Sequence, residues 1–144
     1  MKESGNAVQF ADSNFQKLNK INQKIFRHLH DANKLRELCQ QARLTLQTIS
    51  TKSGVGIEPL EQTRLLDQLM RVCPEVAYAS VPGAGGDDAI FALSITDNNE
   101  AKNQLSLEQR LRSTFLKHHP NLALLPVKLT DPRQSALTLT LTQV

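Results

Sequence analysis

The sequence predicts an α+β domain in which helices cover an antiparallel sheet. Apolar residues recur at helical spacings of three and four over much of residues 15–73. Short β-prone runs then flank a glycine cluster, and the last segment, 136–142, alternates strictly between apolar and polar residues. The predicted order is three helices, two strands, one helix and two strands, which is typical of this fold class.

The length and composition fit one globular domain. The chain has 144 residues, a net charge of +3, and only 4% aromatic residues. Its basic residues form no stripe with interleaved aromatics, so nucleic acid is not an expected partner. The sequence has no run of eighteen apolar residues and no apolar secretory signal at its start. We therefore expect no membrane partner and a cytoplasmic location, with the peroxisome as the alternative.

Three helices are expected in the first half. We predict a flexible lead-in over residues 1–14 and one domain over 15–144. The first helical stripe begins at Phe15 and continues to Leu29. The second ends near Gly54, where glycine can stop a helix, and the third begins at Pro59 and closes before Pro74. The stripe residues are Phe15, Leu18, Ile21, Ile25 and Leu29, then Leu35, Leu38, Cys39, Ala42, Leu46 and Ile49, then Leu60, Thr63, Leu66, Met70 and Cys73.

The cysteines and histidines give no sign of a metal site. Cys39 and Cys73 lie on predicted helices, and we expect reduced core thiols, with a disulfide as the less favoured alternative. A pair of histidines that binds a metal from one helix needs a spacing of four residues, and no two histidines of this chain have that spacing. We therefore expect no metal ligand and interpret the histidines as solvated helix ends: His28, His30, His118 and His119.

The second half supplies the predicted sheet. Strands are expected at 76–80 and 89–95, followed by a polar turn at 96–99 and a helix from Ser106 to His118. Two further strands are expected at 122–129 and 136–142, with a turn at 130–134 between them.

The glycine cluster lies between the first two strands. The eight residues that separate them are too few for a parallel crossover, so the strands must run antiparallel. Eight residues with three glycines exceed a simple hairpin and indicate close approach by another group, with at least one glycine at positive φ. Backbone amides in such a turn can bind an anion such as phosphate. The alternative is a hairpin turn with unusual dihedral angles.

Two motifs resemble those of one enzyme family. Pro-Gly-Ala-Gly-Gly-x-Asp-Ala-Ile, residues 82–90, is similar to the glycine-rich motif in the C-terminal half of GHMP kinases. Within that superfamily the sequence most resembles the eukaryotic type of phosphomevalonate kinase. That family also has an upstream motif which this chain matches at Ser53, Gly54, Val55, Ile57, Glu58, Pro59, Gln62, Thr63, Leu65, Leu66 and Asp67.

The resemblance implies a fold and a reaction. The fold is a ferredoxin-like sheet covered by helices, the C-terminal domain of such kinases. The reaction is phosphoryl transfer from ATP to 5-phosphomevalonate, giving 5-diphosphomevalonate in the mevalonate pathway of isoprenoid synthesis. ATP and Mg²⁺ are the cofactors implied for the intact enzyme, and we expect this chain alone to hold neither. The implied partners are phosphomevalonate, ATP and an N-terminal GHMP kinase domain.

The resemblance also implies site residues, although no catalytic residue is expected within the chain. The residues implied to contact the substrate or the phosphate loop are Ser80, Gly83, Ala84, Gly85, Gly86 and Asp88. Ser80 could equally be an ordinary strand residue, and Asp88 could cap or brace the turn. Asp87 departs from the family, which has tyrosine or glycine there, and adds a negative charge where phosphates would lie.

One family motif does not occur in the sequence. GHMP kinases hold the ATP phosphates with a Pro-x-x-x-Gly-Leu-Gly-Ser-Ser-Ala loop in the N-terminal domain, and the 144 residues contain nothing similar. Phosphoryl transfer depends on such a cradle. We therefore expect this chain alone to be inactive. The alternative to a kinase is a non-catalytic module, derived from that domain, which binds an anion or another protein.

Overall fold

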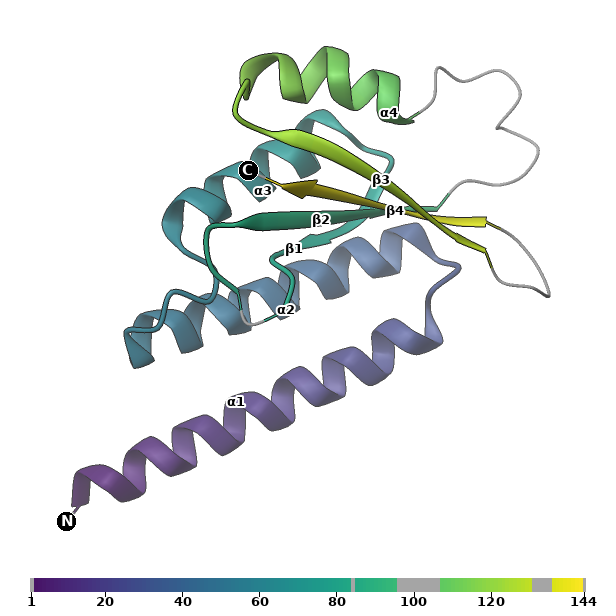
Figure 1. Ribbon diagram of the computed structural model, residues 1–144. Coiled ribbons are helices and arrows are strands. Elements are labelled where there is room, and N and C mark those ends of the chain that lie inside the picture. Colours follow the sequence, from purple (N-terminus) through teal and green to yellow (C-terminus); the bar gives the residue numbers. More distant parts are fainter. Residues whose placement is uncertain (1, 84, 96–106, 131–135, 144) are drawn as a thin grey trace.

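Helices and strands follow one another in the predicted order (Figure 1). The computed structural model describes residues 2–83, 85–95, 107–130 and 136–143, with side chains at 7–83, 85–95 and 107–125. Helices α1 (Lys2–Arg27), α2 (Ala32–Ser53) and α3 (Leu60–Val72) come first. Strands β1 (Val76–Ser80) and β2 (Ala89–Ser94) follow, then α4 (Leu107–Arg110) with a π turn and a 3₁₀ turn, Leu111–Phe115 and Leu116–His118, and finally β3 (Ala123–Thr130) and β4 (Ala136–Gln143).

The described strands form one antiparallel sheet in the order β1-β2-β4-β3. The last strand, β4, therefore lies between β2 and β3. In the β1–β2 hairpin Tyr78 pairs with Leu93 and Ser80 with Phe91. The α+β class, the four strand positions and the antiparallel run of the first two strands are confirmed, to within a residue or two at the strand ends.

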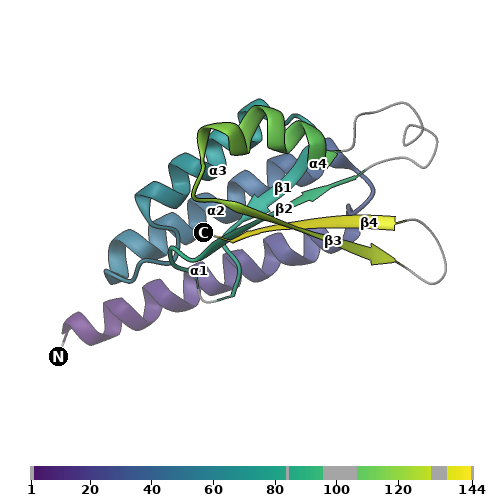
Figure 2. The same ribbon diagram turned by 45° about the horizontal axis from the view of Figure 1, so that its top comes forward.

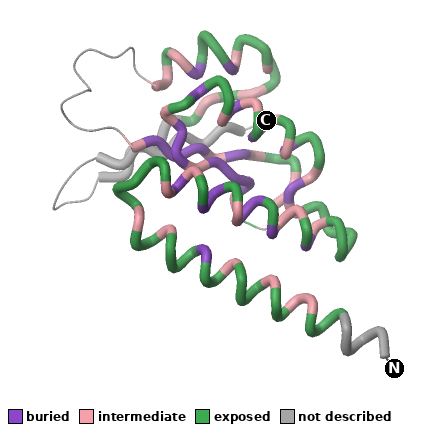
Figure 3. The backbone as a smooth tube through the Cα atoms, turned by 180° about the vertical axis from the view of Figure 1, so that it is seen from behind, coloured by how far each residue is buried: buried purple, intermediate pink, exposed green. Residues whose placement is uncertain are grey.

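Helix α3 and the helical segment 107–118 cover one face of the sheet. Figure 2 shows α3 and α4 together on that face. Leu66 and Phe115, which are 0% and 1% exposed, pack there against Ile90 of β2. Figure 3 shows the buried segments gathered in the sheet and in the helices beside it. Removing these apolar side chains from water stabilises the fold, and this layer holds the largest cluster of buried residues, the main core of the domain.

Helix α2 lies along β1, an edge strand of the described sheet. Arg36 of α2 donates hydrogen bonds to the backbone carbonyls of Met70, Pro74 and Val76. One turn later, Cys39 Sγ lies 3.0 Å from the carbonyl oxygen of Ala79 and 3.3 Å from its amide nitrogen. An uncovered edge strand leaves backbone groups unpaired. Here the side chains of Arg36 and Cys39 bind backbone groups of β1. Both cysteines are buried free thiols, and Cys39 has a structural role in this contact.

Helix α1 differs from the predicted helical stripe in where it begins and in how far its apolar residues are buried. The helix begins at Lys2 rather than at Phe15, so residues 2–14 are its first half. Ile21 packs against α2, but Phe15 is 60% exposed and Leu29 is 38% exposed. Helical spacing shows which residues share a face, not how much of that face meets a partner. The boundary at residue 15 between lead-in and domain stays a prediction.

Some expected features lie outside the described residues. These are the polar turn 96–99, the capping residue Ser106, and residues 131–134 of the turn before β4. The helix predicted from Ser106 is confirmed over 107–118. No helix in the described part of the chain is both long and apolar enough to cross a membrane.

Candidate functional site

The connection between β1 and β2, residues 81–88, is called the glycine loop below. Three of its residues have positive φ: Gly83 at 58°, Gly85 at 86° and Gly86 at 113°. The prediction of positive φ is confirmed. Asp87 and Asp88 belong to this loop and not to a strand, and both are exposed. Glycine suits these positions because a side chain there would strain the backbone.

Gly85 has a second reason to be glycine. A Cβ built on it would lie 2.6 Å from the Cα of Ile57 and 2.7 Å from its carbonyl carbon. Gly83 and Gly86 have no atom within 4 Å of a built Cβ. The group that approaches the loop closely is therefore the backbone of the upstream motif. The two motifs quoted from the sequence meet at this contact.

Two amides of the loop are already engaged. The N–H of Gly85 donates to the carbonyl of Pro82 over 3.1 Å, and the N–H of Gly86 donates to the carbonyl of Ile57, also over 3.1 Å. These bonds fix the shape of the loop. The N–H groups of Gly83 and Asp87 have no acceptor among the described residues, so they are available to donate to an anion.

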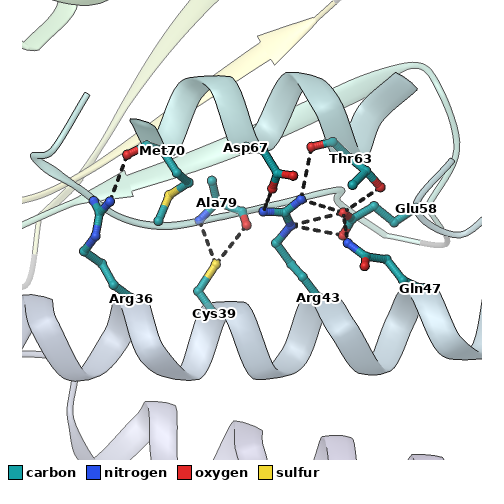
Figure 4. Close-up of polar contacts among 9 residues, drawn as sticks. All are labelled: Arg36, Cys39, Arg43, Gln47, Glu58, Thr63, Asp67, Met70 and Ala79. Carbon is teal, nitrogen blue, oxygen red and sulfur yellow. Dashed lines mark hydrogen bonds and ion pairs between the residues drawn. The ribbon is translucent and has the colours of Figure 1, made fainter. Parts of the chain in front are cut away.

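The segment that contacts the loop, residues 57–62, is called the anchor turn below. Its Glu58 is only 3% exposed. The Glu58 carboxylate accepts hydrogen bonds from Arg43 (2.7 Å from Nη2), Gln47 (2.8 Å) and Thr63 (3.1 Å), as Figure 4 shows. A buried carboxylate is costly unless it is paired and hydrogen-bonded. Here both conditions are met, so Glu58 holds the anchor turn between α2 and α3.

Arg43 connects two carboxylates. It is 7% exposed and, besides Glu58, binds Asp67 with 2.8 Å between Nη1 and Oδ1. Burial disfavours the charged guanidinium, but the hydrogen bonds and charges of Glu58 and Asp67 outweigh it, so the pKa of Arg43 is raised. Arg43 therefore stays protonated at any pH of interest.

Gln62, in the first turn of α3, provides a second link to the glycine loop. Its Nε2 donates to the carbonyl oxygen of Asp87 over 2.8 Å. The residue is 5% exposed, and its Oε1 is buried without a hydrogen-bond partner among the described residues. The anchor turn is therefore joined to the loop by two hydrogen bonds, at Gly86 and at Asp87.

The remaining predicted site residues are placed as follows. Ser80 ends β1 and is 3% exposed, so it points away from bulk solvent. Asp87 and Asp88 make no ion pair with a described residue, although a cavity of about 590 Å³ is lined by Asp87 together with Arg64, His118 and His119. Ala84 lies outside the described residues. The contacts of these residues with a substrate stay predictions.

Within the described part of the chain no three metal-ligating side chains lie together. His119 pairs with Gln68, with 3.1 Å between Nε2 and Oε1, and its ring packs on Phe115. This histidine therefore belongs to the junction of α3 and the 107–118 segment.

The role of Arg43 was not predicted from the sequence. The signal was present, because Arg43 lies one helical turn after Cys39, on the apolar side of α2. A charged residue on such a face requires a buried partner. The acidic residue of the upstream motif, Glu58, was the available candidate.

Fold and site together define a class: an α+β domain whose glycine loop is fixed by a buried, hydrogen-bonded anchor turn.

Comparison with known proteins is more specific. The chain is 33% identical to the peroxisomal phosphomevalonate kinase of Arabidopsis thaliana over 118 residues, which is 82% of this chain and 22% of that protein. It is 42% identical over 77 residues to a phosphomevalonate kinase of Aspergillus fumigatus, covering 54% of this chain and 16% of the relative. Over 79 residues it is 38% identical to the enzyme of Candida albicans, covering 55% and 18%.

By sequence, the chain is similar to part of these phosphomevalonate kinases, which confirms the resemblance seen in the two motifs. It spans about a fifth of the length of these curated relatives. No family model matches the sequence. No solved structure matches it either.

Proposed function

We propose that the chain acts as the C-terminal, ferredoxin-like domain of a GHMP-type phosphomevalonate kinase. In this role it helps to transfer a phosphoryl group from ATP to 5-phosphomevalonate. The observation that supports the proposal most is the contact between Gly85 and Ile57, which joins the two family motifs in space. The similarity to three named phosphomevalonate kinases supports it independently.

The glycine loop is the proposed substrate contact. Catalysis of phosphoryl transfer consists largely of positioning and of stabilising charge. A loop held in one shape, with the N–H groups of Gly83 and Asp87 unengaged by described residues, offers prearranged donors for a phosphate. We assign ATP and Mg²⁺ to an N-terminal GHMP kinase domain, as the resemblance implies. For location we propose the cytoplasm or the peroxisome; the Arabidopsis relative is named as peroxisomal.

A direct assay tests the chain by itself. Purified chain, ATP, Mg²⁺ and phosphomevalonate are followed by coupled ADP release, with Gly85→Val as the control. We expect no magnesium-dependent turnover above the control, because the phosphate-loop motif does not occur in these residues. Turnover well above the control would contradict the assignment of the nucleotide to another domain.

A chimera tests the proposed role. The matched segment of the Arabidopsis enzyme is replaced by the corresponding 118 residues of this chain. We expect an active kinase that loses activity with Gly85→Val and keeps it with Gly54→Asn. Gly54 is a suitable control because it also has positive φ, 72°, and ends α2 with nothing near a built Cβ. A folded but inactive chimera would contradict the proposal and favour the non-catalytic module.

A further inference from the structure

The anchor turn has a function beyond packing. We propose that Gln62 and Glu58 are positioning residues, which hold the glycine loop in the shape that the phosphoryl-transfer step requires. This inference rests on the proposed function. In this proposal neither side chain contacts the phosphate itself; both act through the backbone of the loop.

The first step of the argument is where the loop is held. The carbonyl of Ile57 accepts the N–H of Gly86, and Nε2 of Gln62 donates to the carbonyl of Asp87. Two consecutive loop residues are therefore fixed, one through its donor and the next through its acceptor. The Asp87 N–H, which has no acceptor among the described residues, belongs to the peptide group between these points. Its direction is consequently set by the anchor turn.

The second step is what holds the anchor turn. The Ile57 carbonyl belongs to the peptide group that precedes Glu58. The Glu58 side chain is tied to Arg43 and Gln47 on α2 and to Thr63 on α3. A displacement of the Glu58 side chain would turn that peptide and weaken its bond to Gly86. Glu58 thus links two helices to one hydrogen bond of the loop.

The third step is why residue 62 is a glutamine. The bond to Asp87 needs a donor, which a glutamate at this position could not supply. Its other atom, Oε1, is buried and unpaired, which costs free energy. The hydrogen bond from the amide nitrogen of Gln62 is therefore retained although the amide oxygen is unpaired among the described residues. That hydrogen bond is the restraint on the loop.

Two variants and a matched control test the proposal in the isolated chain, without any assay of activity. Gln62→Met keeps the length and removes the donor, and Glu58→Ala removes the network. Gln68→Met is the control, because Gln68 is also on α3 but pairs with His119. We expect amide hydrogen exchange at Gly86, followed by NMR, to accelerate about tenfold or more in both variants and to be unchanged in the control. Equal exchange in Gln62→Met and the control would overturn the restraint.

The same variants in the active chimera test the link to catalysis. We expect Gln62→Met to lower kcat about tenfold or more while KM for ATP changes little, because misplacing a contact costs rate rather than nucleotide binding. Glu58→Gln should restore much of the rate lost in Glu58→Ala, since its amide oxygen still accepts from Arg43. An unchanged kcat in Gln62→Met would overturn positioning. If the parent chimera were inactive, the proposed function would fail, while the exchange experiment would still decide the restraint.

Discussion

The Cα of Ile57 lies 2.6 Å from the point where a Cβ of Gly85 would be, so the two residues can be adjacent only because residue 85 is glycine. The contact connects an upstream turn to a loop that begins more than twenty residues later. It explains both motifs physically. One supplies a carbonyl and a buried carboxylate, and the other supplies the backbone that fits against them.

Gly85→Ala should destabilise the domain much more than Gly83→Asn. Both residues have positive φ, but only Gly85 lacks room for a Cβ. We expect a loss of about 3 kcal/mol for Gly85→Ala, from left-handed backbone strain and overpacking together. Asparagine tolerates the left-handed region, so Gly83→Asn should cost below about 1 kcal/mol. Urea unfolding measures both, and equal losses would show that Ile57 does not approach Gly85.

Leu66→Ala should create a cavity in the main core. Leu66 is 0% exposed and packs between α3 and the sheet. The expected loss in the free energy of unfolding is about 2–5 kcal/mol. Leu60→Ala on the same helix is the control, because Leu60 is 64% exposed and its loss should stay below about 0.5 kcal/mol. A loss that small at Leu66 would mean that α3 faces the sheet with another side.

Removing one partner of the buried Arg43–Glu58 pair should be severe. Glu58→Ala leaves the guanidinium of Arg43 buried with only the 65% exposed Asp67 side chain as its ionic partner. The expected loss is about 3–5 kcal/mol, and the double variant Arg43→Met/Glu58→Leu should recover much of it, because no buried charge remains. A double-mutant cycle from urea unfolding provides the test. Losses that simply add would contradict a direct interaction.

Stability should fall as the pH rises above about 8.5, the ordinary pKa of an unfolded thiol. Burial raises the pKa of the Cys39 and Cys73 thiols, and it raises the pKa of Tyr78 from 10.0 to about 12. The folded chain therefore keeps protons that the unfolded chain loses, and the difference favours unfolding at alkaline pH. Urea unfolding from pH 7 to 10.5 should show a shallower decline in Cys39→Ala. An identical decline in that variant would contradict the contribution of Cys39.

Local rules were sufficient for the hairpin and its loop. Strands 76–80 and 89–95, their antiparallel run and the positive φ of the glycines all follow from short-range chain geometry. The same rules could not show which group approaches Gly85. That group, the Ile57 backbone, is brought there by the packing of α2 and α3. The loop amides are an example. Short-range rules predict amides that can bind an anion, but the N–H groups of Gly85 and Gly86 donate to carbonyls of the chain itself.

The helices show the same limit. Periodicity correctly placed Leu35, Leu38 and Ile49 of α2 on a buried face. It also grouped Phe15 and Leu29 with Ile21 on one helical face, although Phe15 is exposed and Leu29 lies in the turn after α1. Periodicity did not single out Arg43, because its partners lie on segments that only the fold brings together.

The hydrogen bond between the Gly86 N–H and the Ile57 carbonyl is the most direct test of how the site is built. In the doubly labelled chain, NMR can detect a scalar coupling across this bond, between the amide nitrogen of Gly86 and the carbonyl carbon of Ile57. We predict a resolved coupling, together with slow amide exchange at Gly86, because the Gly86 nitrogen and the Ile57 carbonyl oxygen lie 3.1 Å apart. No coupling, combined with exchange as fast as that of an exposed loop amide, would contradict the account.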